Sequence, residues 1–448
     1  MSFSAAALRA VLDASVPAEA GGLIVALSGG PDSAALLSLA AEVVRGENFR
    51  SLPLRAVHID HGLQPAAANF RDACNRLCTH LSVPLQIVGV EVEHALNVSI
   101  EAAARDARYA AIAAQMRPRE CLLTAHHRED QAETLLLQAL RGAGIKGMSA
   151  MPVCRLFGPG WHVRPLLDVA HSELKEFGAQ LQPFVAMDPM NADLRFDRVY
   201  LRTAIWPLIE KRWPGAAIAL SRSARHMAEA QELLEISAGA EVERVRDGEA
   251  LLIPALRALS PLKRINAVRL WLSQTGREAP STARLAEALR QVFDAEADHQ
   301  PAVEWGGNAL RRYRQRLFAT DADPPQLHDA KPWAGALGSS IELGPGLGNL
   351  TWIAQIGGIA AERLPAALSV RRRDGGETLK PARRARTQTV QHLCQSLGVL
   401  PWMRDALPMV FAGDELIAVG DLWLDARWCA AAGAPGLGIA WNNAPPVI

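Results

Sequence analysis

Short apolar runs alternate with longer amphipathic segments in the first part of the chain. The runs at residues 23–27, 54–59, 84–90 and 121–125 predict four buried strands. Apolar residues recur at helical spacing at residues 33–45, 66–81 and 99–116, and again from about residue 128. Strands and helices alternating in this way are typical of a doubly wound parallel sheet, which binds ligands at the carboxyl ends of its strands. We therefore predict an α/β fold for this part of the chain.

The pattern changes at about residue 206 to long stretches with apolar residues three and four positions apart. Stretches at 217–237, 260–274 and 281–293 predict the helices of a mainly helical middle domain. Acidic residues and prolines at 320–325 indicate a linker, and a strand-rich segment follows, with a small α/β unit at about 368–424. For a chain of 448 residues we expect three domains, at residues 1–215, 216–322 and 323–448.

The composition mainly informs the compartment. The 47 basic and 47 acidic residues balance, so only local basic clusters could indicate a nucleic-acid partner. The six cysteines are scattered without a Cys-x-x-Cys pair, which favours reduced thiols over disulfides or a zinc site. The N-terminus has no signal-peptide pattern, and no apolar run reaches the length of a membrane span. We predict a cytoplasmic protein.

A turn of small residues, Ser-Gly-Gly-Pro-Asp-Ser at 28–33, joins the first predicted strand to the first long helix. Its glycines let the backbone approach a ligand closely, and the N–H groups and dipole at the helix start favour an anion. The turn lacks the lysine of a Walker loop and has Asp32 instead, which points to phosphate neutralised by Mg²⁺ and backbone groups. The hexapeptide is also compatible with an ordinary β-turn.

A second polar cluster begins at the end of the fourth predicted strand, at residues 124–134. If this segment is helical, His126, Asp130 and Glu133 share one face. Such a set could bind a metal, although His-Glu-x-x-His is absent, or it could hold a cationic substrate with the histidine over phosphates. A polar helix start would explain the acidic residues but not two adjacent histidines at a strand end.

These features occur in the order that is found in one family. Similar motifs continue at residues 58–63, 104–109, 126–134, 141–148, 164–167 and 188–191, at Arg198 and Arg202, and near the end at residues 371–373, 376, 400–402, 404 and 408. With the turn at 28–33, the chain resembles bacterial tRNA(Ile)-lysidine synthetase, which belongs to the PP-loop, or N-type, ATP pyrophosphatases. The resemblance covers nearly the whole chain.

The resemblance implies a two-step reaction on RNA. ATP adenylates the C2 oxygen of the wobble cytidine in tRNA(Ile) with a CAU anticodon, and L-lysine then displaces AMP to form lysidine. The modified anticodon decodes AUA instead of AUG. Expected partners are therefore ATP, Mg²⁺, L-lysine and this tRNA, while a homodimer is left open. AMP is a better leaving group than a ring oxygen, and holding three reactants together lowers the entropic cost of their encounter.

The resemblance also assigns roles to residues. The ATP-binding residues are Ser28, Gly29, Gly30, Pro31, Asp32 and Ser33, with Asp32 also contacting Mg²⁺. Asp32, His126, Arg105 and Arg202 are the expected catalytic residues, and Asp130 and Glu133 bind lysine. The expected tRNA-binding residues are Arg371, Arg372, Arg373, Lys380, Arg383 and Arg384. A second basic run at 311–316 carries a tyrosine among arginines and is a further candidate for phosphate contacts.

Some residues depart from the family pattern, and other functions stay open. Glu129 replaces a frequent aspartate, Met190 a small hydroxyl residue and Val199 an asparagine. One alternative is a PP-loop tRNA thiolase, which also adenylates a base but needs reactive cysteines near the site; Cys121 lies on the fourth predicted strand. Another alternative is a non-catalytic protein that binds nucleotide and RNA.

Overall fold

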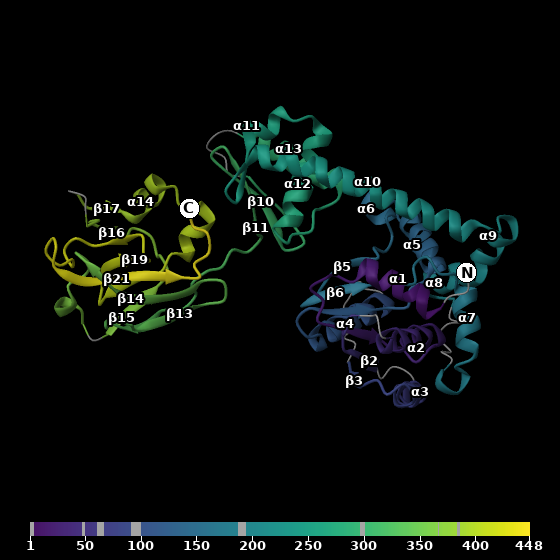
Figure 1. Cartoon of the computed structure of the whole chain (residues 1–448). Helices are drawn as coiled ribbons and strands as arrows, with labels where there is room; N and C mark the ends of the chain where they lie inside the picture. Colours follow the sequence, from purple (N-terminus) through teal and green to yellow (C-terminus); the bar gives the residue numbers. More distant parts are fainter. Residues whose placement is uncertain are drawn as a thin grey trace. The chain divides into compact units, whose positions relative to one another are not determined.

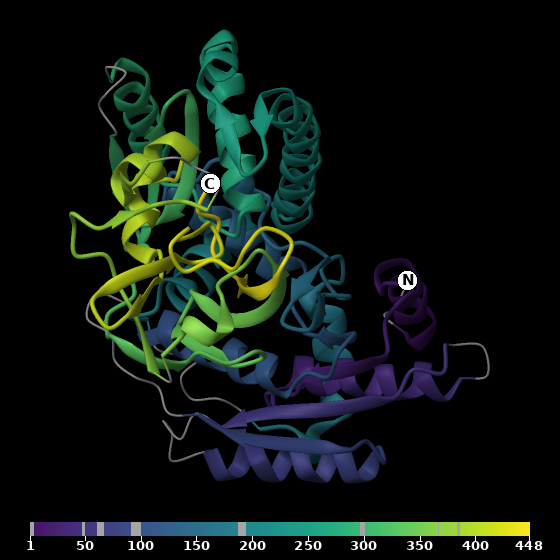
Figure 2. The same ribbon diagram turned by 90° about the vertical axis from the view of Figure 1, so that its left-hand side faces the viewer.

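The computed structural model describes residues 4–46, 50–60, 67–90, 100–186, 194–295, 301–365, 367–382 and 386–448. The chain forms two compact units, Met1–Leu234 and Glu235–Ile448. Figures 1 and 2 show the ribbon from two directions. Among the described helices, none is both long enough and apolar enough to cross a membrane.

The first unit is built on a six-stranded sheet with the strand order β3-β2-β1-β4-β6-β5. The strands are β1 (Gly22–Ala26), β2 (Leu54–Asp60), β3 (Leu85–Gly89), β4 (Glu120–Leu123), β5 (Cys154–Phe157) and β6 (Gly160–Val163). The helices are α1 (Ala5–Ser15), α2 (Pro31–Arg45), α3 (Ala67–His80), α4 (Ile100–Gln115), α5 (Arg128–Leu140), α6 (Ile145–Met148), α7 (His171–Ala179), α8 (Asp197–Tyr200) and α9 (Trp206–Arg212). All neighbouring strands pair in parallel except β5, which is antiparallel to β6.

Alternate residues of the central strands face two separate apolar clusters. On β1, Leu23 and Val25 belong to a cluster with residues of α1, α2, α3 and α7, whereas Ile24 packs with Ile112 and Met116 of the α4 segment. Because side chains of a strand point alternately to the two faces, helices cover both sides of the sheet. The predicted doubly wound parallel sheet is therefore confirmed.

The four predicted strands and their helices lie where the apolar pattern placed them, within a few residues. The hairpin of β5 and β6, which completes the sheet beyond β4, was not predicted. Each of these strands has four residues, which is too short for a clear alternating pattern.

Helix α10 (Ala216–Val245) belongs in part to each unit, and the middle of the chain continues in the second unit. Helices α12 (Pro261–Gln274) and α13 (Thr282–Asp294) agree with the helical pattern, whereas the short helix α11 (Ile253–Ala258) was not predicted. The structure adds an antiparallel sheet in the order β7-β8-β11-β10-β9, formed by β7 (Arg246–Asp247), β8 (Ala250–Leu252), β9 (Ala302–Trp305), β10 (Asn308–Tyr313) and β11 (Arg316–Asp321). This sheet, which the sequence did not predict, shares one core with α12 and α13.

The last part of the chain is rich in strands, as the Gly/Pro-broken pattern indicated. One sheet has the order β12-β15-β18-β19-β20 and another β13-β14-β21. The strands are β12 (Lys331–Ala334), β13 (Ser340–Gly344), β14 (Gly348–Ile356), β15 (Ala367–Arg371), β18 (Met409–Ala412), β19 (Glu415–Val419), β20 (Trp423–Leu424) and β21 (Pro435–Asn442), with the pair β16 (Thr378–Leu379) and β17 (Gln388–Thr389) and the helix α14 (Val390–Leu397). A single apolar cluster joins both large sheets to α14.

Candidate active site

The turn between β1 and α2 is held by its own serines. Ser33 Oγ accepts a hydrogen bond from Ser28 N at 3.1 Å and lies 3.0 Å from Ser28 Oγ. Gly29 has a φ of 88°, and a Cβ there would lie 3.0 Å from the Phe70 ring on α3, so both backbone and space require glycine. Helix α2 begins directly after Gly30, with Pro31 in its first turn. The predicted loop at the carboxyl end of β1 thus has the form expected of an anion site.

Asp32 lies in the first turn of α2, and its Oδ1 is buried without a hydrogen-bond partner in the described part of the chain. Burial raises the pKa of this carboxyl, although His171 and His127 partly offset the effect. A carboxylate oxygen without a hydrogen bond at a phosphate-type loop is chemically suited to a hard cation such as Mg²⁺, which prefers oxygen ligands.

Two histidines lie beside Asp32. One ligand atom each of Asp32, His127 and His171 lies within 4.8 Å of the others, and His171 Nε2 is 3.7 Å from Asp32 Oδ1. The two imidazole rings are stacked, with centroids 4.5 Å apart and 11° between their planes. Because the nitrogen lone pairs lie in the ring planes, nearly parallel rings do not aim them at one ion. Asp32 alone of the three therefore suits a metal here.

His127 lies between two carboxylates at the start of α5. Its Nδ1 lies 3.0 Å from Glu129 Oε2, and its Nε2 lies 3.4 Å from Asp130 Oδ2. Burial opposes the charge, but the hydrogen bond to Glu129 and the nearby Asp130 and Asp32 raise the pKa of His127 above its ordinary value. Glu129 also accepts a hydrogen bond from His171 N at 2.8 Å. The residue that departs from the family pattern thus ties α5 to α7.

His126 precedes helix α5, which begins where the apolar pattern predicted it, so His126 does not share the helix face of Asp130 and Glu133. Helix α5 begins at Arg128 and His127 is its N-cap, so His126 belongs to the extended segment after β4. Its Nδ1 lies 2.8 Å from Thr124 Oγ1. Burial and the neighbouring Arg164 and Arg105, acting against Asp130, lower the pKa of His126 to about 3. His126 is therefore neutral near pH 7.

Asp130 and Glu133 lie together on α5, as their spacing predicts, and are bound by two arginines. Arg202 donates from Nη2 to Asp130 Oδ1 at 2.8 Å and from Nε to Glu133 Oε1 at 2.7 Å. Arg198 donates from Nε to Glu133 Oε2 at 3.1 Å. Two carboxylates thus face two guanidinium groups, and the acid pair carries no excess negative charge in this state.

The charges of this cluster stabilise one another. Burial alone would raise the pKa of Asp130, but His127, Arg198 and other cations lower it below its ordinary value. Arg202 follows α8 in a π-helical stretch, Leu201–Ile205, and such stretches are often found at functional sites. Burial disfavours the Arg202 charge, yet the hydrogen bonds to Glu133 and the Asp130 charge raise its pKa.

Arg105 lies on α4 and interacts electrostatically with residues of the site. Its guanidinium carbon is 5.0 Å from the centre of the Tyr109 ring. Its positive charge contributes to the low pKa of both His126, which follows β4, and His162 on β6. This position agrees with a role near a phosphate, which remains a prediction.

Several site residues were not singled out, or were given no role, by the sequence analysis. Arg198 belongs to the family pattern but received no role. For His162, Arg164 and His171, nothing in the sequence indicated which residues lie beside them in the fold. The separation between Glu133 and Arg202 is 69 residues, which no local pattern spans. The predicted segments at 61–63 and 188–191 lie outside the described residues.

The predicted tRNA-binding residues differ in how they are placed. Arg372 is exposed, whereas Arg371 lies 3.7 Å from the centre of the Phe411 ring and Arg373 is 3.8 Å from Glu377. Lys380 follows β16 and is half-buried. Arg383 and Arg384 lie outside the described residues.

The basic run at 311–316 is largely used inside the protein. Arg312 is buried and donates from Nη1 to the backbone oxygens of Val292 and Ala295 at 2.9 and 2.7 Å. Arg316 pairs with Asp247 at 2.7 Å and Arg314 donates to Gln395 O. These guanidinium groups support the fold, so the run is a weaker candidate for RNA contacts than the sequence suggested.

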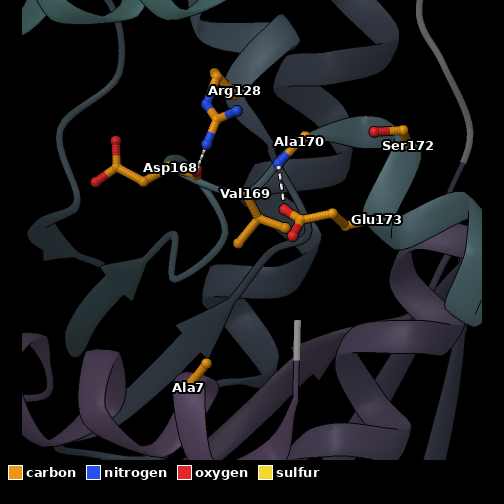
Figure 3. A pocket seen from close by; sticks show the side chains of 7 residues that line it. All are labelled: Ala7, Arg128, Asp168, Val169, Ala170, Ser172 and Glu173. Carbon is orange, nitrogen blue, oxygen red and sulfur yellow. Dashed lines mark hydrogen bonds between the residues drawn. The ribbon is translucent and has the colours of Figure 1, made fainter. Parts of the chain in front are cut away.

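A surface hollow of about 500 Å³ lies beside the starts of α5 and α7 (Figure 3). Its lining residues are Ala7, Arg128, Asp168, Val169, Ala170, Ser172 and Glu173. Arg128 donates to Asp168 O, and Glu173 accepts from Ala170 N at 3.2 Å, so these polar groups hold the loop before α7 (Figure 3). The hollow contains none of the turn or acid-pair residues.

Comparison with known proteins places this site in a family. Residues 4–209 match a model of the PP-loop domain, 251–318 the TilS substrate binding domain and 368–441 the TilS substrate C-terminal domain. A protein of Alkalilimnicola ehrlichii named tRNA(Ile)-lysidine synthase is 39% identical, with 92% of each chain covered. Proteins of the same name from Coxiella burnetii and Xanthomonas campestris are both 36% identical, covering 93% and 95% of this chain and 91% and 96% of theirs. The chain therefore belongs to the tRNA(Ile)-lysidine synthase family.

Proposed function

We propose that this protein is a ligase that forms a C–N bond between L-lysine and the wobble cytidine of tRNA(Ile) with a CAU anticodon. ATP transfers its AMP group to the C2 oxygen of the cytidine and releases diphosphate. The lysine side-chain amine then attacks C2, and the oxygen leaves with AMP. The amine must lose a proton first, because its ordinary pKa is about 10.4.

One observation carries the proposal: the acid pair and the phosphate-type turn form a single site. His127 Nε2 lies 3.4 Å from Asp130, and His127 and Asp32 belong to the same 4.8 Å cluster. An amine held at Asp130 and Glu133 would therefore be close to a nucleotide held at the turn. The turn's backbone and serines bind the phosphates in this proposal, and Asp32 would hold Mg²⁺, which would supply charge neutralisation. His127 lies beside them, and its protonated form would add positive charge there.

The two arginines on the acid pair give the lysine step a specific requirement. Asp130 and Glu133 hold the α-ammonium group of lysine, because clamping the reacting amine would keep it protonated. Since Arg198 and Arg202 already balance both carboxylates, one of them has to leave. Arg202 is the better candidate, since its side chain is 45% exposed while that of Arg198 is 25% exposed. Once released, Arg202 can meet a phosphate group.

The alternative tRNA thiolase activity has less support. Such chemistry needs a thiolate or a cluster-binding cysteine near the adenylated base. Cys121 is fully buried on β4, and burial raises the pKa of its thiol to about 12. Its thiol is therefore protonated and inaccessible in this state.

The decisive experiment is mass analysis of the wobble nucleoside. The full-length protein is incubated with ATP, Mg²⁺, L-lysine and the CAU-anticodon tRNA(Ile), and the tRNA is then digested. We expect a cytidine that has gained one lysine and lost one water, and no gain when ATP or lysine is omitted. Exchange of oxygen for sulfur with a sulfide donor would instead favour the thiolase. An unmodified nucleoside in every arm would favour a non-catalytic binding protein.

A further inference from the structure

A series of hydrogen bonds links the buried residues Arg164, His162 and Thr124 to the half-buried His126. Arg164 Nη2 lies 3.0 Å from His162 Nδ1, His162 Nε2 lies 2.8 Å from Thr124 Oγ1, and Thr124 Oγ1 lies 2.8 Å from His126 Nδ1. His162 has no exposed surface, and Arg164 and Thr124 are also buried. These hydrogen bonds therefore connect β6 with the extended segment after β4, and only His126 at their end is partly exposed.

The arginine fixes where the protons of His162 are. A guanidinium group has only donors, so His162 Nδ1 must accept the hydrogen bond from Arg164. The neutral ring then carries its proton on Nε2 and donates to Thr124 Oγ1. Burial and the Arg164 charge lower the pKa of His162, which excludes the doubly protonated ring.

The hydrogen bond between Thr124 and His126 in turn determines which nitrogen of His126 carries the proton. Its hydroxyl has one proton, and its oxygen already accepts from His162. Donating that proton to His126 Nδ1 satisfies both groups, whereas a protonated His126 Nδ1 would leave the buried hydroxyl proton without an acceptor. Leaving a buried donor unpaired is unfavourable, because the donor loses its hydrogen bond to water without gaining another. The ring of His126 therefore keeps its single proton on Nε2.

We propose that Arg164, His162 and Thr124 are positioning residues that hold His126 as the neutral Nε2–H tautomer, ready to donate one hydrogen bond to a phosphate group. This inference rests on the proposed function for its ligand, the triphosphate of ATP. Among the described residues, His126 makes its side-chain hydrogen bond through Nδ1 only, which leaves Nε2 for that ligand. A neutral donor binds the phosphate without itself titrating near pH 7.

The charged groups around His126 agree with this assignment. Asp130 of α5 favours a charged ring, whereas Arg164 after β6, Arg105 of α4 and Arg198 of α8 oppose it, as does burial. His162 is neutral for the reason given above. The hydrogen bond from Thr124 adds to these effects, because protonating His126 Nδ1 would leave the Thr124 hydroxyl proton without its acceptor.

The test reads the tautomer directly by NMR. Full-length protein labelled with ¹⁵N-histidine is recorded without ligands, and His126 is assigned through the His126→Gln variant. In the wild type we expect proton couplings that place the hydrogen on Nε2 and no protonation of the ring down to about pH 5. Thr124→Val removes the hydroxyl at nearly constant shape and should allow the Nδ1–H form, with the pKa of His126 moving toward its ordinary value. Thr124→Ser keeps the hydroxyl and should restore the wild-type spectrum.

Activity gives an independent readout. In Thr124→Val, diphosphate release should acquire an acid limb in its pH profile and a lower kcat, with the KM for ATP little changed. A wild-type ring protonated on Nδ1, or a Thr124→Val spectrum identical to the wild type, would overturn the proposal that Arg164, His162 and Thr124 fix the tautomer of His126. If the tautomer is as expected but His126→Gln releases diphosphate at the wild-type rate, the assignment of His126 to ATP fails instead.

Discussion

Arg202 and Glu133 form a two-point ion pair in which only one partner can move easily. Arg202 Nε lies 2.7 Å from Glu133 Oε1, and Arg202 Nη2 lies 2.8 Å from Glu133 Oε2. The Glu133 side chain is 2% exposed, whereas that of Arg202 is 45% exposed. An incoming ammonium group could therefore replace the arginine without exposing or reorganising the carboxylate.

Arg202→Ala should separate the two steps of the reaction. Removing the competing guanidinium leaves the acid pair with one unbalanced negative charge. We expect lysine to bind the ligand-free variant more tightly by about 1 kcal/mol, or roughly fivefold. Adenylation should fall by about 10²–10³, the usual loss when one donor to a developing negative charge is removed. Calorimetry with lysine and a diphosphate-release assay measure the two effects.

Arg212→Ala is the matched control, because Arg212 is an exposed arginine on the neighbouring α9 that lies over Trp213. It should change neither quantity. Weaker lysine binding in Arg202→Ala would show that the arginine supports the lysine site and does not compete for it.

Glu133→Gln should impair lysine use more than ATP use. The amide keeps the shape of the side chain but loses its charge, and a hydrogen bond to a charged group contributes about 1.5–3 kcal/mol. The KM for lysine should rise roughly ten- to hundredfold, while the KM for ATP stays within about twofold. Asp197→Asn serves as the control, since Asp197 is an exposed carboxylate on α8 that pairs with Arg141. Equal increases in both KM values would exclude a lysine pocket at Glu133.

How far the sequence predicts this site depends on the distance between the residues along the chain. The three-residue spacing of Asp130 and Glu133 predicts their common helix face, because it depends only on helix geometry. His126 is not on that face, because helix α5 begins at Arg128, as the apolar pattern predicted, and His126 precedes it. The partners Arg198 and Arg202 come from a segment more than 60 residues away, which only the folded chain brings to α5.

In the fold, too, elements with a long local pattern were predicted and elements with a short one were missed. Long apolar runs such as that of β1 predict parallel strands well, since both faces of such a strand are buried. The β5–β6 hairpin and the strands beside α11–α13 escaped prediction because two to six residues carry too little periodicity. Their pairing is set by tertiary contacts, such as that between Leu317 and Leu251.

Asp32→Asn should abolish adenylation and stabilise the ligand-free protein. Burial raises the pKa of Asp32, so the folded state binds its proton more tightly than the unfolded state does. The stabilisation from that proton is present below the unfolded pKa and is lost as the pH rises through the folded pKa. At pH 7 the buried charge is therefore a cost, which the amide removes.

Thermal unfolding at several pH values tests whether the buried charge of Asp32 destabilises the folded protein at pH 7. The variant should melt at a higher temperature than the wild type at pH 7, and the difference should shrink as the pH falls toward about 4. Diphosphate release should be lost while tRNA binding persists. Asp13→Asn, which removes an exposed carboxylate paired with Arg9 on α1, should leave activity unchanged. Retained turnover in Asp32→Asn would remove Asp32 from the mechanism.

The three arginines at 371–373 should contribute differently to tRNA binding, because their surroundings differ. Exposed Arg372 is free to meet a phosphate, whereas Arg371 packs on Phe411 and Arg373 lies near Glu377. Each phosphate contact releases counterions and adds about 0.9 to the slope of log affinity against log salt. Arg372→Ala should lower that slope by about 0.9, as measured by anisotropy of labelled tRNA over a salt series.

Arg371→Ala should instead lower the melting temperature, because its packing on Phe411 is lost. Arg290→Ala is the control: its guanidinium is paired with Glu287, and it should change neither the slope nor the melting temperature. An unchanged slope in Arg372→Ala would show that this segment does not contact the RNA backbone.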